Sequence, residues 1–304
     1  MLDPSLVFGR LVLYLSLMAA FGLPMFAWQI VRGHAQSAVA ARLLKLSGVG
    51  SVLGLLASLF GLWAMVKGMT GGDASSMRAT AHILLTQTSV GAAWIVRVVV
   101  LLLAAGAAVS PGSVRFRMCL AATFGAAALA TLAWTGHGAM SAGAVAWLHL
   151  GADISHLLAA GAWIGALMSF ALIARQTSAD KTDVSFRLLA DTAKGFAQLG
   201  SVIVAVLLIS GAINYVLVVG PSLSGLVATT YGRVLLIKLG LFAGMLLLAA
   251  ANRFRITPTL EVALREGGQA AAAATLQRSI RLEAALGFAV LLIVAGLGTM
   301  DPSA

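Results

Sequence analysis

Eight long apolar runs constrain the fold of this chain more than any other feature of its sequence. Each is close to the roughly 20 residues that an α-helix needs to cross ~30 Å of hydrocarbon. Of 304 residues, 60% are hydrophobic and 10% are charged, unlike the composition of soluble domains. The alternation of lipid-facing β-strands is absent. We therefore predict an all-α, polytopic integral membrane protein with eight transmembrane helices, at residues 6–31, 43–66, 84–109, 118–134, 145–174, 196–219, 234–251 and 282–297.

Basic residues follow an alternating pattern along the chain. The connections after runs one, three, five and seven hold most of the 20 Lys and Arg residues, whereas the others hold only Lys67 and Arg78. By the positive-inside rule, both termini are predicted to face the periplasm. The net charge of +10 is thus a topology signal and gives no support to nucleic-acid binding. The chain has no GxxxxGK[ST] loop and no large connection, so no nucleotide partner is expected.

The chain shows no composition shift that would divide it, and we predict a single transmembrane domain over residues 1–304. The first run follows Asp3 and contains Arg10, and it lacks a small-residue cleavage site, so it is interpreted as an uncleaved span. The one cysteine, Cys119, excludes an internal disulfide and a CxxC motif.

The fifth run carries three ionisable side chains on one predicted helix face. His149, Asp153 and His156 stand at i, i+4 and i+7, about 10.5 Å along the axis. Ionisable groups inside a bilayer are costly and are functional candidates by default. His137 closes the fourth run and His82 opens the third at the same membrane face. Imidazole binds copper, zinc or haem iron, and a carboxylate can ligate or orient a histidine, so these five residues are the predicted metal site.

Methionines and buried cations form two further sets of candidates. Thioethers together with imidazoles favour copper, although packing is the common use of methionine. The possible secondary metal ligands are Met65, Met69, Met77 and Met140. Buried or nearly buried polar groups are interpreted as a transport path or as structural ion pairs, with Asp153 as the only carboxylate clearly within the membrane to pair with them. They are Arg97, Asn214, Arg233 and Lys238.

Several stretches, chiefly in the second half of the chain, resemble the copper resistance protein D family. The similarity covers about residues 135–300 and keeps the order and spacing of its motifs, whereas the first half is similar in length and in the placement of Arg97 after Trp94. The motifs are GH at 136–137, DISHLLAAGAWIGAL at 153–167, SGAINYVLVVG at 210–220, YGRVLLIKLGLFAGMLLLAAANRFRITP at 231–258 and RSIRLEAALG at 278–287.

The resemblance implies a multi-pass protein of the bacterial inner membrane that acts in copper homeostasis and moves copper across that membrane. We expect no enzymatic activity, except under the haem alternative below. It implies a separate periplasmic copper-binding partner of the CopC type. Copper-handling histidines would fall on His137, His149 and His156, with Asp153 beside them. The copper oxidation state stays open, because thioethers favour Cu(I) and histidine with carboxylate accepts Cu(II).

Two other functions remain open on the residues alone. Two histidines on facing helices, such as His137 or His82 with His149 or His156, are suitable axial ligands for one haem b, which would indicate electron transfer or haem-linked oxidation. A structural subunit without a ligand is the third reading. For copper, we expect capture by His137 and the methionines, transfer to His149, Asp153 and His156, and release past runs six and seven, where no ladder of ligands is visible.

Overall fold

The structure, a computed structural model, describes residues 4–30, 34–135, 143–221 and 225–300. Within them, eight helices are long and apolar enough to cross a membrane, which confirms the predicted fold class. The elements are α1 (Pro4–Ile30), α2 (His34–Thr70), α3 (Ala74–Gln87), α4 (Ser89–Val109), α5 (Val114–Ala130) with the 3₁₀ turn η1 (Thr131–Thr135), α6 (Ala144–Asp180), α7 (Asp183–Val218), α8 (Gly225–Ala228), α9 (Thr230–Ala251), the π-helical turn η3 (Asn252–Ile256), α10 (Thr257–Glu266) and α11 (Gln269–Leu297).

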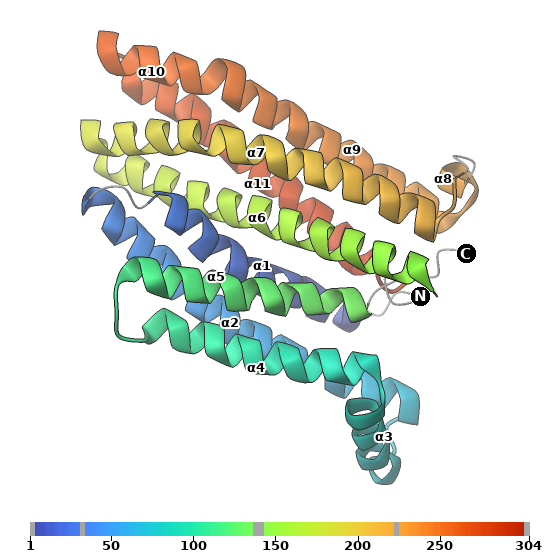
Figure 1. The fold of residues 1–304 in the computed structure, drawn as a ribbon. Coiled ribbons are helices and arrows are strands. Elements are labelled where there is room, and N and C mark those ends of the chain that lie inside the picture. The colour runs from blue at the N-terminus through green and yellow to red at the C-terminus, as the bar shows by residue number, and fades with distance from the viewer. Residues whose placement is uncertain (1–3, 31–33, 136–142, 222–224, 301–304) are drawn as a thin grey trace.

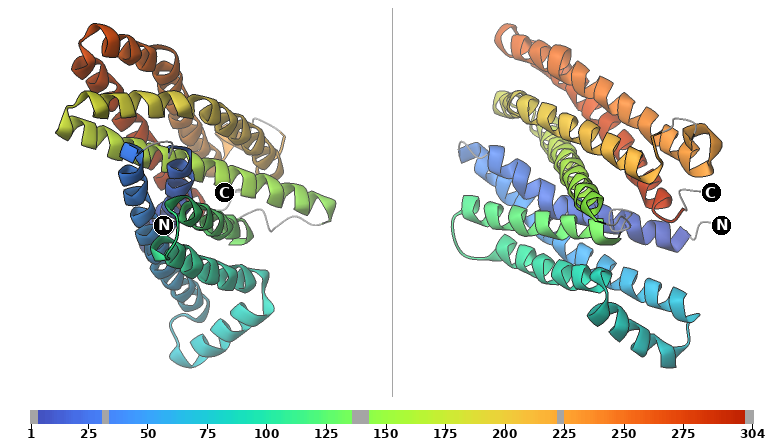
Figure 2. Two further views of the ribbon diagram at one scale, coloured as in Figure 1. Left: turned by 60° about the vertical axis from the view of Figure 1, so that its left-hand side comes forward. Right: turned by 45° about the vertical axis from the view of Figure 1, so that its right-hand side comes forward.

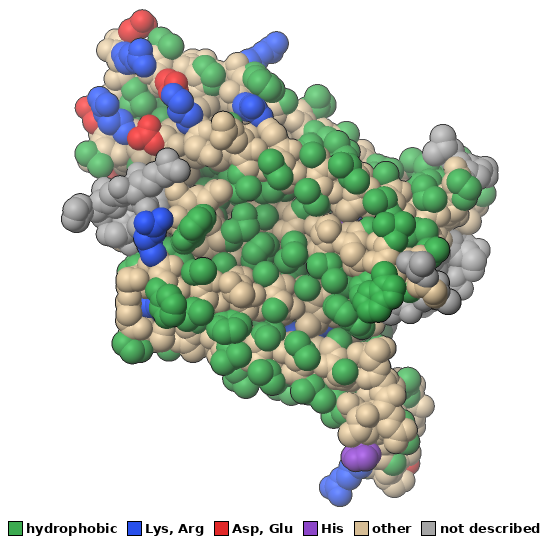
Figure 3. Space-filling view, viewed as in Figure 1, with side chains coloured by type: hydrophobic (Ala, Val, Ile, Leu, Met, Phe, Trp, Pro, Cys, Tyr) green, Lys and Arg blue, Asp and Glu red, His purple; other side chains and the backbone are tan. Residues whose placement is uncertain are grey.

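The spanning helices form two groups of four, as Figures 1 and 2 show. One group is α1, α2, α4 and α5, the other is α6, α7, α9 and α11, and α1 packs against α6 and α11 where they meet. Both termini lie with α3 and α8 at one end, here called the termini end. Most Lys and Arg side chains visible in Figure 3 lie at the opposite end with α10, here called the basic end. The side of the membrane that each end faces stays a prediction.

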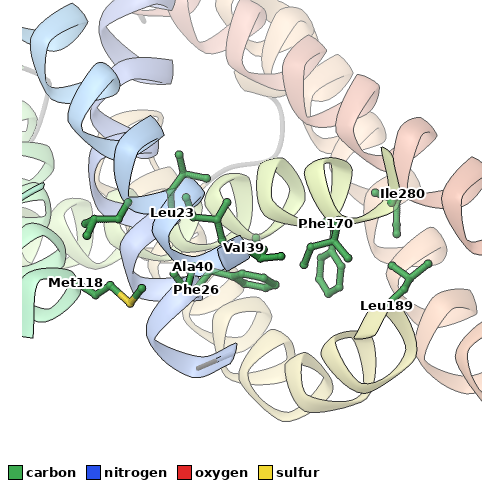
Figure 4. Close-up of a cluster of buried hydrophobic side chains, with 14 of the residues drawn as sticks. Leu23, Phe26, Val39, Ala40, Met118, Phe170, Leu189 and Ile280 are labelled. Carbon is green, nitrogen blue, oxygen red and sulfur yellow. The ribbon is translucent and has the colours of Figure 1, made fainter. Parts of the chain in front are cut away.

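A hydrophobic core near the basic end joins the two groups (Figure 4). Leu23 and Phe26 of α1 pack with Phe170 of α6, Leu189 of α7 and Ile280 of α11. The rings of Phe26 and Phe170 meet edge to face, with centroids 5.1 Å apart. Such aromatic pairs add about 0.5–1.5 kcal/mol beyond the burial of their area. This core therefore fixes α6, which carries the predicted site, against α1.

Two glycines set the distance between α1 and α6. A Cβ added to Gly22 would come within 2.7 Å of the Gly165 Cα, and one added to Gly165 would overlap the Gly22 backbone. Only glycine permits backbones to approach so closely, a common device where small residues face each other in membrane helices. The sequence DISHLLAAGAWIGAL thus supplies both the polar face of α6 and its contact with α1.

The third span begins later than predicted. The chain leaves helical geometry at Thr88, whose backbone is extended (φ −124°, ψ 151°) and whose hydroxyl accepts the Gly91 N–H at 3.0 Å as the cap of α4. Gly91 packs directly on the Leu84 carbonyl, where any Cβ would clash. The prediction of one helix from residue 84 was therefore wrong, and α3 is a separate helix that turns away from the bundle.

The start of α3 is capped by Asp73, outside the spanning segments. Its carboxylate accepts hydrogen bonds from the Ser75 hydroxyl at 2.6 Å and the Ser76 N–H at 3.0 Å. These donors, the Ser75 hydroxyl first, favour the charged form and lower the pKa of Asp73 to about 2. The cap therefore stabilises α3 above the ordinary aspartate pKa of about 3.9 and is lost as the pH falls towards 2.

The predicted connection at 252–279 is helical almost throughout. The π turn η3 continues α9 into α10 without a break, and the chain reverses at Gly267 and Gly268, which have φ of +98° and +88°. Of the two alternatives predicted for 265–281, a surface helix or a loose linker, the helical one holds for most of the segment, but its residues from Gln269 on are the first turns of α11 and continue into the last span. Glu283, the second residue of the predicted last span, is therefore near the middle of a 29-residue helix.

Candidate metal site in the cavity between the helix groups

A cavity of about 1190 Å³ lies between the two helix groups and receives residues from α1, α2, α4, α6, α7, α9 and α11. Its wall is largely aliphatic and aromatic, and its polar groups come from both halves of the chain. Ligand sites are typically such concave apolar spaces with a few convergent polar groups. Within the described residues, the cavity is thus the candidate ligand site, because it is concave, mostly apolar and lined by a few polar groups.

One face of α6 supplies the ionisable groups of the cavity. His149, Asp153 and His156 all line it, as the i, i+4, i+7 spacing predicts. His149 is 3% exposed, and the other two are partly exposed towards the cavity. The helix turns this face towards the space between the groups because the neighbouring Gly161 and Gly165 hold α6 against α1.

His156 is held in one orientation by α7. Its Nδ1 lies 3.0 Å from the Ser210 Oγ, and the Ser210 hydroxyl donates to the Val206 carbonyl at 2.5 Å. Because serine has one hydroxyl proton, the imidazole Nδ1–H is the donor towards Ser210. The Nε2 atom then keeps a free lone pair, the form in which histidine binds a metal while a second partner orients its ring. The ring packs against Gly211 of α7, where a Cβ would lie at an ordinary contact distance of 3.5 Å from its Cε1.

Asp153 lies between an amide and a cation. Asn214 of α7 donates from Nδ2 to Asp153 Oδ1 at 3.5 Å, and Lys238 of α9 attracts the carboxylate electrostatically. The Asn214 Oδ1 atom is buried and has no hydrogen-bond partner among the described residues. Such an orphaned acceptor is costly unless a cation or water meets it. The predictions that Asn214 and Lys238 lie beside the site are therefore consistent with the cavity geometry.

The other predicted residues divide between the cavity and its surroundings. Met65 and Met69 line the cavity from α2. His82 is exposed on α3, Met77 is half-buried on the same helix, and Arg233 is exposed on α9, where its Nε donates to the Thr229 carbonyl at 3.4 Å. None of these three lines the cavity. His137 and Met140 lie outside the described residues.

Arg97 is paired differently from the prediction. It is 4% exposed, and it donates from Nε to the Thr131 Oγ1 at 2.7 Å and from Nη2 to the Thr131 carbonyl at 3.2 Å. The expectation that Asp153 was the only membrane carboxylate available to the buried cations was wrong on two counts. A hydroxyl and a carbonyl satisfy Arg97, and Glu283 of α11 is a second buried carboxylate, 5% exposed.

We expect Arg97→Met to lower the free energy of unfolding by about 1–3 kcal/mol, because the buried Thr131 carbonyl loses its guanidinium donor. Combining it with Thr131→Val is expected to cost less than the sum of the single changes, since the two residues share one interaction. Unfolding in detergent measures both, with the exposed Arg78→Met as the control. Strict additivity would contradict this account of Arg97.

The described residues do not form a closed metal cage. No three His, Cys, Asp or Glu side chains among them are close enough to share one ion. Both cavity histidines also come from the same helix, so a bis-histidine haem in this cavity would need an axial ligand from outside the described residues. A metal held by His149 or His156, alone or together with Asp153, would thus need further ligands such as thioethers or amide or water oxygens.

Comparison with known proteins identifies the family. The model for the N-terminal domain of copper resistance protein D-like proteins matches residues 1–147, and the model for copper resistance protein D matches residues 190–297. Because these matches lie in separate segments, the interpretation of one domain stays a prediction. No solved structure matches the chain.

Three curated relatives span nearly the whole chain. Copper resistance protein D of Pseudomonas syringae pv. tomato is 40% identical and covers 99% of this chain and 97% of its own. Copper transport protein CutJ of Bacillus subtilis (strain 168) is 29% identical over 99% of this chain but 53% of its own length. Inner membrane protein YebZ of Escherichia coli (strain K12) is 27% identical, and the match covers 96% of this chain and 97% of its own length. The chain, a multi-pass membrane protein with eight candidate spans in its described residues, therefore belongs to the copper resistance protein D family.

Proposed function

We propose that this chain is a copper transporter of the bacterial inner membrane, and not an enzyme, and that copper enters the cavity from the termini end. The single observation that carries the proposal is that His149, Asp153 and His156 of α6 line one cavity between the two helix groups. The positive-inside rule assigns the basic end to the cytoplasm and the termini end to the periplasm. A relative of similar sequence is named a copper transport protein, and another an inner membrane protein.

The spacing of the ligands favours passage over storage. The i, i+4, i+7 row spreads imidazole and carboxylate groups over about 10.5 Å of α6. Conduction requires sites that bind an ion strongly enough to admit it and weakly enough to release it. Successive sites with few protein ligands meet that requirement, whereas a closed four-ligand cage would retain the metal.

Each group in the row has a distinct chemical role in the proposal. Met65 and Met69, soft thioethers on α2, favour Cu(I) at the cavity wall, and His137 with Met140 would receive the ion before it reaches α6. The Nε2 of His156 then ligates copper while Ser210 holds the ring. Asp153 balances the charge of the ion, and the orphaned Asn214 Oδ1 meets the cation or its water. The positive charge of Lys238 balances the negative charge of Asp153 once copper has left.

The proposed partners are the lipid bilayer and a separate copper-binding protein. The exposed apolar belt over the middle of the bundle contacts the lipid bilayer (Figure 3). A separate periplasmic copper-binding protein of the CopC type would deliver copper to the termini end, where the cavity lies between the helix groups. Copper is thus the cargo of the protein and passes through it.

A flux assay tests the proposal directly. The purified chain is placed in vesicles with copper outside, and entry is measured by a copper-sensitive dye within the lumen. We expect copper to enter faster than in vesicles that carry the His149→Ala/His156→Ala variant, while zinc and calcium entry stays at the background of protein-free vesicles. Equal copper entry in all three preparations would overturn the proposed function.

An absorption spectrum separates copper from the haem alternative. We expect purified protein, expressed with ample haem supply, to show no Soret band, because both described cavity histidines lie on one helix. The measurement is a visible spectrum before and after reduction, with added hemin as a positive control for the detection limit. A stoichiometric Soret band that disappears in the His156→Ala variant would favour the haem function instead.

A further inference from the structure

A second buried carboxylate lies beyond the inner limit of the cavity. Glu283 of α11 is 5% exposed. Its Oε1 accepts the Trp163 Nε1–H of α6 at 2.9 Å, and its Oε2 accepts from the Asn252 Nδ2 at 3.1 Å. Asn252 is the first residue of the π turn η3, and such turns occur often at functional sites. Glu283 thus links α6, α9 and α11 where α9 leaves its regular helix.

Trp163 separates Glu283 from the cavity. The indole is 4% exposed and lines the cavity, and it packs on Phe242 with ring centroids 5.9 Å apart. Met245 and Gly287 line the same part of the wall. Trp163 follows His156 by seven residues, about 10.5 Å along α6 towards the basic end. The carboxylate therefore holds the aromatic side chain that forms this part of the wall.

Glu283 has only neutral partners. Among the described residues, its interactions are with Trp163 and Asn252, and the one salt bridge present joins Lys194 and Glu261. A buried carboxylate without a counter-charge is costly in its ionised form. The site must therefore take up a cation, and the smallest that fits between existing hydrogen bonds is a proton.

Charged groups on the surrounding elements are engaged elsewhere. Arg253 of η3 donates to the Ala197 carbonyl at 3.1 Å and to the Ser201 hydroxyl, and Arg281 of α11 donates to the Gln277 carbonyl at 3.3 Å. Arg10 of α1 lies beside Gly298, fifteen residues or about 22 Å along α11 from Glu283. Asp153, His156 and Lys238 line the cavity. The remaining charged residues of η3, α7, α10 and the start of α11 are exposed at the basic end. They are Arg255, Asp183, Arg187, Asp191, Arg265, Glu266 and Arg278. On α6, Arg175 follows Trp163 by twelve residues, about 18 Å.

The Asn252 amide suits both charge states of Glu283. Its Nδ2 donates to the carboxylate, while its Oδ1 is buried and has no partner in the part of the chain that the structure describes. When Glu283 binds a proton at Oε2, a half-turn of the amide presents Oδ1 as the acceptor for the new O–H. An amide has a donor and an acceptor of similar shape on the two sides of one axis, so the exchange needs no change in packing.

We propose that Glu283 is a proton-binding residue and that its protonation is coupled to copper movement through the neighbouring cavity, the coupling resting on the proposed function. In the coupled cycle the proton adds to Glu283 Oε2 from water on one side of the membrane and leaves to water on the other, through the basic end and through the cavity beyond Trp163, so that one proton crosses for each copper ion. Trp163 transmits the change, because its N–H bond to Oε1 is strong to a carboxylate and weaker to a neutral acid. Glu283 thereby supplies the coupling ion for a chain that has no nucleotide motor.

Proton binding is tested without copper. Infrared difference spectra between acidic and alkaline pH detect the C=O stretch of a protonated carboxyl in the full chain in lipid. We expect a buried carboxyl band in the unmodified protein and in Glu261→Gln, whose altered residue is a partly exposed carboxylate paired with Lys194. The band is expected to disappear in the near-isosteric Glu283→Gln and to return, shifted, in Glu283→Asp. A band unchanged in Glu283→Gln, or no band in the unmodified protein, would overturn proton binding.

Coupling is tested in vesicles that carry an imposed pH difference. If one proton moves per copper ion, the steady-state copper ratio across the membrane changes by about tenfold per pH unit. Glu283→Gln is expected to keep copper binding and lose this dependence, whereas Glu261→Gln keeps both. A copper ratio that ignores pH in the unmodified protein overturns the coupling but leaves the proposed function standing. Absence of copper flux overturns the proposed function, and the infrared result then decides proton binding independently.

Discussion

The double substitution His149→Ala/His156→Ala is expected to abolish copper binding to the purified chain. Both side chains line the cavity, and Ser210 leaves the Nε2 of His156 free to ligate. Even the loss of a residue that only orients a metal ligand costs about 10–100-fold in affinity, so loss of both imidazoles is expected to exceed 100-fold. Isothermal titration with Cu(I) and with Cu(II), together with metal analysis of the purified protein, measures the effect.

The matched control for this experiment is His82→Ala. His82 is the same residue type on the same chain, but it is exposed on α3 and does not line the cavity, so its removal is expected to leave copper affinity unchanged. Ser210→Ala, which removes the partner of His156 Nδ1, is expected to weaken copper binding by about 10–100-fold. Copper stoichiometry that is unaffected by the double substitution would refute the α6 site, and an equal loss from His82→Ala would move the site to α3.

Replacing Gly165 by leucine is expected to prevent correct assembly of the two helix groups. A Cβ at this position overlaps the backbone of Gly22, so α1 and α6 would have to separate and open the core around them. Overpacking a core costs about 1–3 kcal/mol and more where a backbone must move, as it must here. We expect a loss of more than about 3 kcal/mol, measured by unfolding in detergent and by the fraction of monodisperse protein.

Gly240→Leu is the control for the glycine substitution. Gly240 also lies in a spanning helix, α9, but nothing is within 4 Å of a Cβ added there, and the position is exposed. Its stability is expected to stay within about 0.5 kcal/mol of the unmodified protein, as for most surface changes. Comparable destabilisation by Gly240→Leu and Gly165→Leu would show that the loss of stability comes from replacing any glycine in a span, and not from disrupting the α1–α6 contact.

Much of the candidate site was predictable because it lies within one helix. The spacing of His149, Asp153 and His156 defines a common face wherever an α-helix forms, and the cost of ionisable groups in lipid turns that face inward. Asn214 and Lys238 were identified as buried polar groups for the same reason. The partners of these residues were not predictable, since Ser210 and Thr131 meet His156 and Arg97 from other helices.

Glu283 shows why the remaining functional residues escaped prediction. Hydropathy places a polar residue near the start of an apolar run at the membrane surface. Glu283 is the second residue of the run 282–297, so hydropathy places it there. The helix in fact begins at Gln269, fourteen residues before Glu283, so this carboxylate lies in the middle of α11. The boundary of a helix depends on such capping and reversal, here at Gly267 and Gly268, more than on hydropathy.

By itself the sequence determined the number of spans, the common end of both termini and the polar face of α6, because bilayer thickness and helical periodicity act on each segment separately. Tertiary structure alone decided that this face meets a cavity, that His82 lies apart from it, and that Glu283, Trp163 and Asn252 form a buried group. Those contacts join residues as much as 120 positions apart in the chain. They depend on how helices pack, as at the close approach of Gly22 and Gly165, and no local pattern in the sequence records that packing.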